Sequence, residues 1–298
     1  MKPIGVVGSI NLDLVTRVKD LPKLGETISG EGFNVLFGGK GANEAVACSR
    51  LGHKSMMFGA VGTGQFSDMA ILNLKKNKVD TKNVIQIKDE SVGIAFITLA
   101  NKNNSIIVNP NANALINDSH FEKMKKDILK CGIIGAQLEI PAEIVKKLSV
   151  FTKANGIKLV FNPSPMVKYS PEIFKNADYV IVNEIEITQL SGYNPKTPFS
   201  LLEKYPNKLI LTKGKEGPFL HNGKKIVNYP SVNTTPVDTT GAGDTFLGAF
   251  MVKINEGQTP EEACIYANLA AGMKCTKLGA QTGMPTAAEV EQYAKQKA

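Results

Sequence analysis

Residues 237–246 of this chain read Val237-Asp238-Thr239-Thr240-Gly241-Ala242-Gly243-Asp244-Thr245-Phe246 and stand directly before a run of apolar residues. The apolar side chains recur at helical spacing until Gly257, which predicts a helix with Asp244 in its first turn. The first N–H groups of a helix have no partner within it, and together with the helix dipole they attract anions. Glycine and alanine at 241–243 would leave that backbone open to a phosphate.

Asp244 would stand beside this anion pocket, where a carboxylate can take a proton from a hydroxyl group that attacks phosphorus. The stretch therefore indicates phosphoryl transfer to an alcohol, with Asp244 as the general base. A purely structural interpretation stays open, because Asp and Thr before an apolar helix usually serve as caps. Asp238, Thr239 or Thr240 could cap this helix.

A second motif reads Phe37-Gly38-Gly39-Lys40-Gly41-Ala42-Asn43-Glu44-Ala45 and runs into a helix that ends at Leu51-Gly52. Gly8-Ser9-Ile10-Asn11-Leu12-Asp13 directly follows an apolar strand at Ile4–Val7. In these motifs the sequence resembles the ribokinase-like sugar kinases, also called the phosphofructokinase-B family, and the resemblance extends from Val6 to Pro285. Within the family, these motifs are most similar to those of members that phosphorylate ribose. The resemblance implies ATP-dependent conversion of D-ribose to D-ribose 5-phosphate.

Apolar strands and helices alternate along the chain, a pattern typical of a parallel sheet covered by helices on both faces. Pro141 to Asn155 is one expected helix, and Thr259-Pro260-Glu261-Glu262 is a capping box for another that runs toward Lys277, with Gly279 as its terminator. Asn222-Gly223 predicts a tight hairpin turn. We therefore expect an α/β fold with a mostly parallel central sheet, whose strands are Ile4–Val7, Ser55–Ala60, Gly132–Ala136, Lys158–Phe161, Tyr179–Val182 and Leu209–Leu211.

Two stretches break this alternation, at approximately 13–37 and 91–109, because they contain strand-like runs with no helix between them. The residues alone predict only additional antiparallel strands. The family resemblance implies that they form a small β-sheet lid over the sugar site, and that two copies of the chain pair through it as a homodimer. No internal repeat or low-complexity linker divides the chain, so we expect one kinase domain over residues 1–298.

The composition is ordinary for a globular protein, with 43% hydrophobic and 21% charged residues. The formal net charge of +8 would favour anionic ligands such as ATP, but the lysines are dispersed rather than arranged as a nucleic-acid-binding arm. The four cysteines form no CxxC pair, and neither a signal peptide nor a membrane span is apparent. We expect a cytoplasmic protein whose partners are a sugar and ATP rather than nucleic acid or a membrane.

Two rivals to a kinase remain. A dinucleotide dehydrogenase would carry Gly-x-Gly-x-x-Gly after its first strand, whereas this chain reads Gly5-Val6-Val7-Gly8-Ser9-Ile10-Asn11. A Walker-type P-loop also fails, because Gly41 follows Lys40 and Glu216 follows Lys215. The second rival is a non-catalytic sugar sensor, which would not need the base that Asp244 supplies.

Sugar recognition requires hydrogen-bonding side chains that converge on hydroxyl groups. Asn11 and Asp13 stand just beyond the carboxyl end of the first strand, where open parallel sheets bind ligands. The resemblance implies further sugar contacts at Gly39, Lys40, Gly41, Ala42, Asn43, Glu139 and Asp244.

The nucleotide contacts also follow from the resemblance. Asn183-Glu184-Ile185-Glu186 matches a family motif, Asn-x-x-Glu, whose glutamate organises Mg²⁺ through water, although such a pattern by itself usually caps a helix. The resemblance implies that ATP contacts Asn183, Glu186, Thr212, Gly214, Gly241, Ala242, Gly243 and Asn268.

The resemblance further implies a potassium ion (K⁺) beside the anion pocket, held mainly by backbone carbonyl groups. The matching positions are Asp238, Thr240, Lys274, Lys277, Gly279 and Gly283. Gly283 stands where the resembled sequences can carry serine, so any side-chain oxygen is lost there. Because Lys274 and Lys277 lie nearby in the sequence, one ammonium group could instead replace the ion.

Departures from the family pattern bear on the identity of the sugar. Gly62-Thr63-Gly64-Gln65-Phe66-Ser67 stands where the family commonly reads Gly-x-Asp-x-Phe-Gly, and the lid reads Val108-Asn109-Pro110-Asn111-Ala112-Asn113. We expect altered packing of the 62–68 loop beside the substrate. D-ribose is the first expectation, while deoxyribose, another pentose, a nucleoside and a ketohexose stay open.

Overall fold

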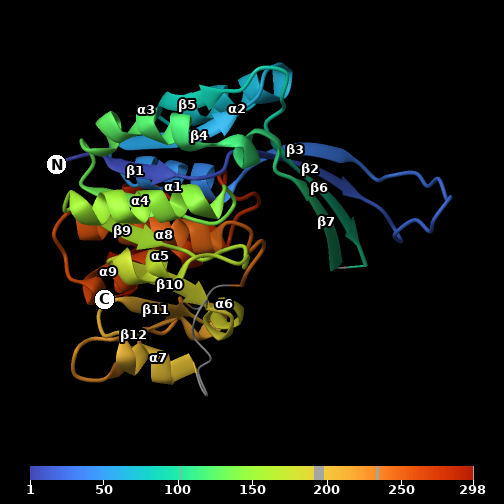
Figure 1. Cartoon of the computed structure of the whole chain (residues 1–298). Coiled ribbons are helices and arrows are strands. Elements are labelled where there is room, and N and C mark those ends of the chain that lie inside the picture. Colours follow the sequence, from blue (N-terminus) through green and yellow to red (C-terminus); the bar gives the residue numbers. More distant parts are fainter. Residues whose placement is uncertain (102, 191–197, 233–234, 298) are drawn as a thin grey trace.

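A central sheet organises the chain in the computed structural model, which describes residues 1–101, 103–190, 198–232 and 235–297 (Figure 1). Within these residues the sheet has nine strands in the order β13-β12-β11-β10-β9-β8-β1-β4-β5. Neighbouring strands run parallel from β11 to β5, and β12 and β13 continue the sheet antiparallel. The strands are β1 (Ile4–Val7), β4 (Ser55–Val61), β5 (Val79–Gln86), β8 (Ile133–Ala136), β9 (Lys158–Phe161), β10 (Tyr179–Asn183), β11 (Leu209–Thr212), β12 (Pro218–His221) and β13 (Ile226–Asn228).

Helices cover both faces of this sheet because alternate strand residues point to opposite sides. In β1, Ile4 and Val6 belong to one buried cluster, whereas Val7 belongs to the other. The first cluster includes residues from α1 (Lys40–Arg50), α2 (Gln65–Lys76), α8 (Ala242–Asn255), α9 (Pro260–Lys274) and α10 (Ala287–Lys297). The second includes residues from α3 (Asp118–Ile128), α4 (Ala142–Ala154), α5 (Pro171–Asn176), α6 (Glu184–Thr188) and α7 (Pro198–Lys204). The predicted α/β fold is confirmed.

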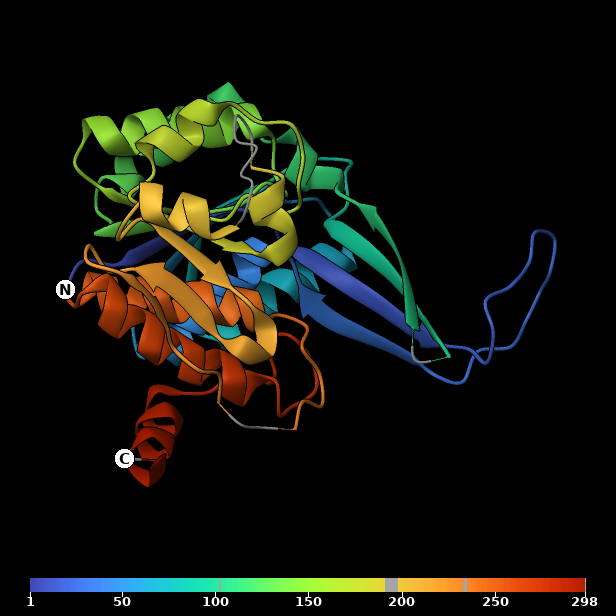
Figure 2. The same cartoon turned by 90° about the horizontal axis from the view of Figure 1, so that it is seen from below.

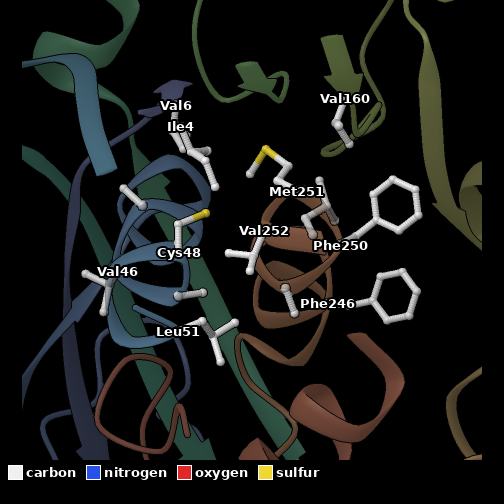
Figure 3. Close-up of a cluster of buried hydrophobic side chains, with 14 of the residues drawn as sticks. Ile4, Val6, Val46, Cys48, Leu51, Val160, Phe246, Phe250, Met251 and Val252 are labelled. Atoms are coloured by element: carbon white, nitrogen blue, oxygen red, sulfur yellow. The ribbon is translucent and has the colours of Figure 1, made fainter. Parts of the chain in front are cut away.

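Helices α1 and α8 pack side by side beneath β1, with Cys48 of α1 and Val252 of α8 pointing toward one another's helix, whereas Phe246 and Phe250 point away from α1 (Figure 3). Small residues let the two helices approach closely, since a Cβ at Gly248 would lie 2.5 Å from the Cβ of Ala47. The Sγ of Cys48 lies 3.5 Å from the carbonyl oxygen of Gly248. This packing fixes the N-terminus of α8 beside the N-terminus of α1, although about 200 residues separate them in the sequence.

A second sheet, the predicted lid, projects from the body (Figures 1 and 2). Its order is β3-β2-β6-β7, built from β2 (Asn11–Arg17), β3 (Phe33–Gly38), β6 (Gly93–Ala100) and β7 (Asn103–Asn109). Residue 102, within the second predicted lid segment, lies outside the described residues. β2 pairs antiparallel with β3, and β6 with β7, but β2 and β6 run parallel. The expectation of purely antiparallel strands was therefore wrong at the junction of the two hairpins.

Several local expectations can be compared with the structure. The capping box at Thr259 and the hairpin at Asn222-Gly223 are confirmed. Helix α9 ends at Lys274, with Cys275 as its C-cap, earlier than the predicted end near Lys277. No side chain caps α8, because its N-cap residue is Gly241 in a left-handed conformation, so the suggested capping by Asp238, Thr239 or Thr240 was wrong. None of the described helices combines the length and apolarity that a membrane span requires.

Candidate active site

The strand order places a natural ligand site at the carboxyl ends of β1 and β8. The chain continues from β1 toward β4 and β5, and from β8 in the opposite direction toward β9, so these strands flank the point where the winding reverses. Ligands of open α/β sheets bind at such a point. Ser9 follows β1 and donates its hydroxyl proton to Glu139, which follows β8. The backbone N–H of Lys40 donates to the same carboxylate at 3.0 Å, so Glu139 lies at the N-terminus of α1.

The glycine motif before α1 allows this close approach. Gly39 has φ of 86°, and a Cβ there would lie 2.7 Å from the backbone nitrogen of Asn11. A Cβ at Gly41 would lie 2.7 Å from the backbone of Gly8 and Ser9. The glycines at 39 and 41 therefore let the turn lie directly against the residues that follow β1.

Asp244 lies at the start of α8 and is only 8% exposed. The side-chain amide of Asn43 donates to one of its oxygens at 2.6 Å, and the Lys40 ammonium lies 4.0 Å from the other. Gln281 in turn donates to the Asn43 amide oxygen at 2.9 Å. Asp244 is thus held by α1 rather than serving as the cap of its own helix. Its carboxylate keeps an oxygen beside Lys40 that can accept a proton.

Carboxylates crowd this end of the sheet and change one another's protonation. Burial, reinforced by the negative charges of Glu139 and Asp244, raises the pKa of Asp13 to about 6. Burial would lower the pKa of Lys40, but Asp244 and Glu139 outweigh it and raise the pKa on balance. Lys40 is therefore a fixed positive charge among acidic side chains. A ligand with many hydroxyl groups could donate to these carboxylates.

The segment that follows the last strand of the second sheet contributes to the same site through Asn113 in η1 (Asn111–Leu115). Its amide nitrogen donates to Asn11 Oδ1 at 2.8 Å, and its amide oxygen accepts from the backbone of Ile10 at 3.0 Å. A Cβ at Gly93 would lie 2.1 Å from Asn11 Oδ1. Asn113, like Ser9 and Gln281, was not among the predicted site residues. Only its position in an asparagine-rich stretch after β7 could have drawn attention to it.

Two of the predicted nucleotide residues, Asn183 and Thr212, lie at the carboxyl ends of β10 and β11 and are register partners, whereas Gly241–Gly243 lie at the start of α8 and Asn268 lies in α9. Asn183 and Glu186 form the capping box of α6, with the carboxylate accepting from the Asn183 N–H at 2.9 Å and from the Asn162 amide at 3.2 Å. Gly214 begins a short 3-10 helix, η2 (Gly214–Glu216). The Asn268 side chain donates to the carbonyl groups of Tyr229 and Pro230, so it fixes the chain after β13.

The predicted cation positions gather around Asp238, ahead of α8. Its carboxylate accepts from the backbone N–H of Thr240 at 2.9 Å and of Gly279 at 2.8 Å. Burial raises the pKa of Asp238, but these hydrogen bonds and the Lys274 charge outweigh it and lower the pKa on balance. Lys274 points into the same place and donates from its ammonium group to the Asp238 carbonyl oxygen at 2.7 Å. Lys277 points elsewhere and pairs with Glu289 at 2.9 Å.

The 62–68 loop, predicted to pack in an unusual way, is fixed by the residues that precede β6. The Thr63 N–H donates to the carbonyl oxygen of Glu90 at 2.9 Å, and a Cβ at Gly62 would lie 1.9 Å from that oxygen. Gly64, with φ of 94°, then starts α2. Gly62 is therefore required for contact with the segment leading into the lid.

Comparison with known proteins accounts for this arrangement. Residues 1–287 match the model of the pfkB family carbohydrate kinases. The chain belongs to the pfkB family of carbohydrate kinases. A ribokinase from Lactococcus lactis is 38% identical over 297 residues, which is 99% of this chain and 98% of that protein.

Solved structures extend the comparison to three dimensions. The ribokinase of Thermotoga maritima superposes on this chain with a TM-score of 0.90 at 34% identity. The superposition covers 99% of this chain and 100% of the Thermotoga protein. The Arabidopsis thaliana ribokinase, solved in complex with ribose and ATP, gives a TM-score of 0.89 at 29% identity, with 99% of each chain covered. The large sheet with its helices and the smaller separate sheet thus have counterparts in solved ribokinases.

Proposed function

We propose that this kinase transfers the γ-phosphoryl group of ATP to the 5-hydroxyl group of D-ribose. The observation that carries the proposal is the buried Asp244 at the start of α8, held by Asn43 and facing Lys40. The full-length similarity to ribokinases supports the choice of ribose. Asn11, Asp13, Asn43 and Glu139 supply the hydrogen-bonding groups for the remaining hydroxyl groups, with Gly39–Ala42 as the turn that positions them.

The reaction follows from the chemistry of these groups. Asp244 accepts the proton of the attacking hydroxyl group, whose oxygen forms a bond to the γ-phosphorus while the bond to the bridging oxygen of ADP breaks. The N–H groups of Gly241 and Gly243 then face the transferred phosphoryl group, whereas the Ala242 N–H already donates to the Thr239 carbonyl oxygen at 3.1 Å. A Cβ at Gly243 would meet nothing within 4 Å, so the backbone there is open to a ligand. Any side chain at 243 would occupy this approach.

The nucleotide side is proposed on similar grounds. ATP would extend toward the carboxyl ends of β10 and β11, where Asn183, Thr212 and Gly214 lie. Asn268 of α9 supports this region by its hydrogen bond to the Tyr229 carbonyl oxygen. Bound magnesium would neutralise the charge that develops on the phosphate groups during transfer. Glu186 fits an indirect role, because its carboxylate is already fixed by Asn183 and Asn162 and can orient water around the ion. For the monovalent cation, the sequence leaves two alternatives, a bound potassium ion or the ammonium group of a nearby lysine.

We also propose that the chain acts as one domain in the cytoplasm and that two copies pair through the lid, without nucleic acid or membrane as partner. Both faces of the lid carry exposed apolar side chains that a second copy could cover, Phe96 and Ile107 on one face and Ile106 and Val108 on the other. Cys48, Cys131 and Cys264 are free and buried, which suits a reducing compartment. Sedimentation of the purified protein, with and without Ile107→Lys, tests the dimer.

A coupled assay of ADP formation tests the proposed reaction. D-ribose is expected to give the highest kcat/KM among D-ribose, 2-deoxy-D-ribose, other pentoses, a nucleoside and a ketohexose. Product analysis is expected to place phosphate on the 5-oxygen. A higher kcat/KM for another sugar would replace ribose but keep the kinase. Sugar binding without ADP formation from any of them would favour the non-catalytic sensor.

A further inference from the structure

The side chain of Lys274 lies where the family resemblance predicts a potassium ion. Lys274 is 0% exposed, although it is the last residue of α9 and carries a charge. Its ammonium group donates to the carbonyl oxygen of Asp238 at 2.7 Å and lies 3.7 Å from the Asp238 carboxylate. A buried ammonium requires such partners, because burial of an unpaired charge is strongly unfavourable.

Two of the carbonyl groups predicted to hold the ion, those of Lys277 and Gly279, lie close to this side chain. A Cβ built at Gly283 would lie 3.0 Å from the Gly279 oxygen, 3.1 Å from the Lys277 oxygen and 3.2 Å from Lys274 Cε. These three atoms therefore border one small space beside Gly283. The lysine chain crosses that space to reach Asp238. A serine at 283 would press against both the carbonyl groups and the lysine.

The lack of a side chain at Gly283 thus leaves room for the Lys274 side chain, and the two residues together do not suit a potassium site. Potassium would have to share the Asp238 oxygens with an ammonium group already bonded there, and two positive charges at that separation repel. The lost serine oxygen at 283 removes a further ligand. The residues present do not fit the ion.

We propose that the Lys274 ammonium permanently replaces the monovalent cation beside the anion hole, so that phosphoryl transfer by this kinase does not depend on potassium. The inference rests on the proposed function, because the loop it concerns would receive the γ-phosphate. The ammonium supplies a positive charge behind the 241–243 backbone. It also ties residue 238 to the end of α9, where the Cys275 oxygen accepts from the N–H groups of Val237 and Asp238.

The first test compares desalted wild-type protein in potassium, caesium, sodium and tetramethylammonium chlorides at equal ionic strength and fixed Mg²⁺. The wild-type rate is expected to vary by less than about twofold among these salts, because the site already contains its cation. Thermal unfolding of the protein without substrates is expected to give the same Tm in all of them. Potassium activation of severalfold, or a rise in wild-type Tm that is specific to potassium, would overturn the proposal.

Removal of the ammonium should create the cation dependence that the wild type lacks. Lys274→Ala is expected to lose about tenfold or more of the rate in sodium, since the fixed charge near the phosphate is gone. Potassium should restore part of that loss and raise the Tm of the variant, as expected when a ligand binds the folded state. A Lys274→Ala enzyme that keeps its wild-type rate in sodium would contradict the inference.

Further variants separate a charge effect from a folding effect. Lys274→Met keeps the buried chain without its charge, so it should lose rate and not respond to potassium. Lys274→Ala/Gly283→Ser restores a side-chain oxygen and should respond to potassium more strongly than Lys274→Ala alone. Lys253→Ala is the control, because Lys253 also pairs with a carboxylate, at 2.8 Å from Glu256, but at the far end of α8. Equal salt responses in all four variants would refute the proposal.

The two kinds of readout keep this inference separate from the proposed function. If no sugar is phosphorylated, the Tm of Lys274→Ala in potassium and sodium still decides whether the lysine replaces the ion. If the wild-type kinase is active but activated by potassium, the inference fails and the kinase function stands.

Discussion

The sugar side and the nucleotide side of the candidate site are held together by different kinds of contact. On the sugar side, buried side chains from distant segments bond directly to one another, as in Asn43 to Asp244 and Asn113 to Asn11. On the nucleotide side, the contacts are local or involve backbone, as in the Asn183–Glu186 capping box and the Asp238–Thr240 turn. The residue that would face a phosphate, Gly243, is exposed and has no side chain.

This difference affects how much each side of the site lowers the stability of the folded protein. The sugar side gathers Asp13, Glu44, Glu139 and Asp244, with Lys40 as a positive charge among them, and the mutual repulsion of the carboxylates raises the pKa of Asp13 and Glu44 in addition to burial. The nucleotide side offers N–H groups that any helix start provides. We infer that polar substitutions on the sugar side change both stability and activity, whereas those on the nucleotide side change activity with little effect on folding.

The largest effect is expected for Asp244→Asn. The new side chain can still accept a hydrogen bond from Asn43 through its amide oxygen, so folding should be preserved, but it cannot accept the proton of the sugar hydroxyl group. We expect kcat to fall by about 10²–10⁴-fold, the usual contribution of a general base, while the sugar Kd changes much less. Stopped assays and calorimetric sugar binding measure the two quantities. A variant that keeps more than about a third of the wild-type kcat would remove Asp244 from the mechanism.

Asp13→Ala should follow, with a selective loss of sugar affinity. An unpaired buried partner costs about 1–3 kcal/mol, so we expect the sugar KM to rise about tenfold while the ATP KM stays within about twofold. Because the pKa of Asp13 is about 6, protonation below that pH removes an acceptor, and the wild-type sugar KM should rise as the pH falls from 7 to 5.

Asp13→Asn is the matched control for that pH dependence, since an amide does not titrate in this range. Its sugar KM should be high but flat between pH 5 and 7. It should also unfold at a higher temperature than wild type at pH 7, because it lacks a charge that is repelled by Glu139 and Asp244. A loss confined to ATP, or an unchanged sugar KM, would contradict the assignment of Asp13.

The sequence could predict the residues whose roles depend on local geometry. Gly39, Gly41, Asp244 and the Asn183–Glu186 pair each stand at the start of a helix, and a helix start can be recognised from a few consecutive residues. The strands of the parallel sheet were also predicted correctly from their apolar runs, apart from β5, which was not predicted. The strand Val79–Gln86 mixes polar with apolar residues and exposed with half-buried ones, so it contains no continuous apolar run.

The contacts that the sequence could not predict join distant segments. Gln281 bonds to Asn43 across 238 positions, and Asn113 to Asn11 across 102. No local spacing reports such pairs. The parallel pairing of β2 with β6 is of the same kind, because it depends on how two hairpins meet. The sequence leaves open whether a carbonyl site or the ammonium group of Lys274 or Lys277 supplies the charge, and only the structure shows that the Lys274 ammonium turns inward to Asp238.

Glu186→Gln tests the nucleotide side with a smaller expected effect. The amide oxygen can still accept from Asn183 and Asn162, so the helix start should persist and the Tm should stay close to that of wild type. Loss of the negative charge should raise the Mg²⁺ concentration needed for half-maximal rate severalfold, with the sugar KM unchanged. A change in sugar KM as large as the change in Mg²⁺ requirement would show that the two sides are not independent.

Glu44→Gln should have the smallest effect on turnover and the clearest effect on stability. Glu44 is fully buried in α1, accepts from the Gln137 amide at 2.5 Å, and has a second oxygen with no hydrogen-bond partner among the described residues. Burial, reinforced by Asp244, raises its pKa well above the ordinary value of 4.5. The folded protein therefore holds a proton that the unfolded chain releases above that value, and wild-type stability falls as the pH rises.

Glutamine cannot lose a proton, so the stability advantage of Glu44→Gln over wild type should be small near pH 4 and grow toward pH 8. A difference of about 1 kcal/mol at the higher pH would raise the Tm by about 2–4 °C, or slightly less, in a chain of this length. Glu143→Gln, at an exposed position in the first turn of α4, is the control and should show no such pH trend. Parallel Tm curves for wild type and Glu44→Gln across pH 4–8 would mean that the acidic sugar side does not cost the fold stability through Glu44.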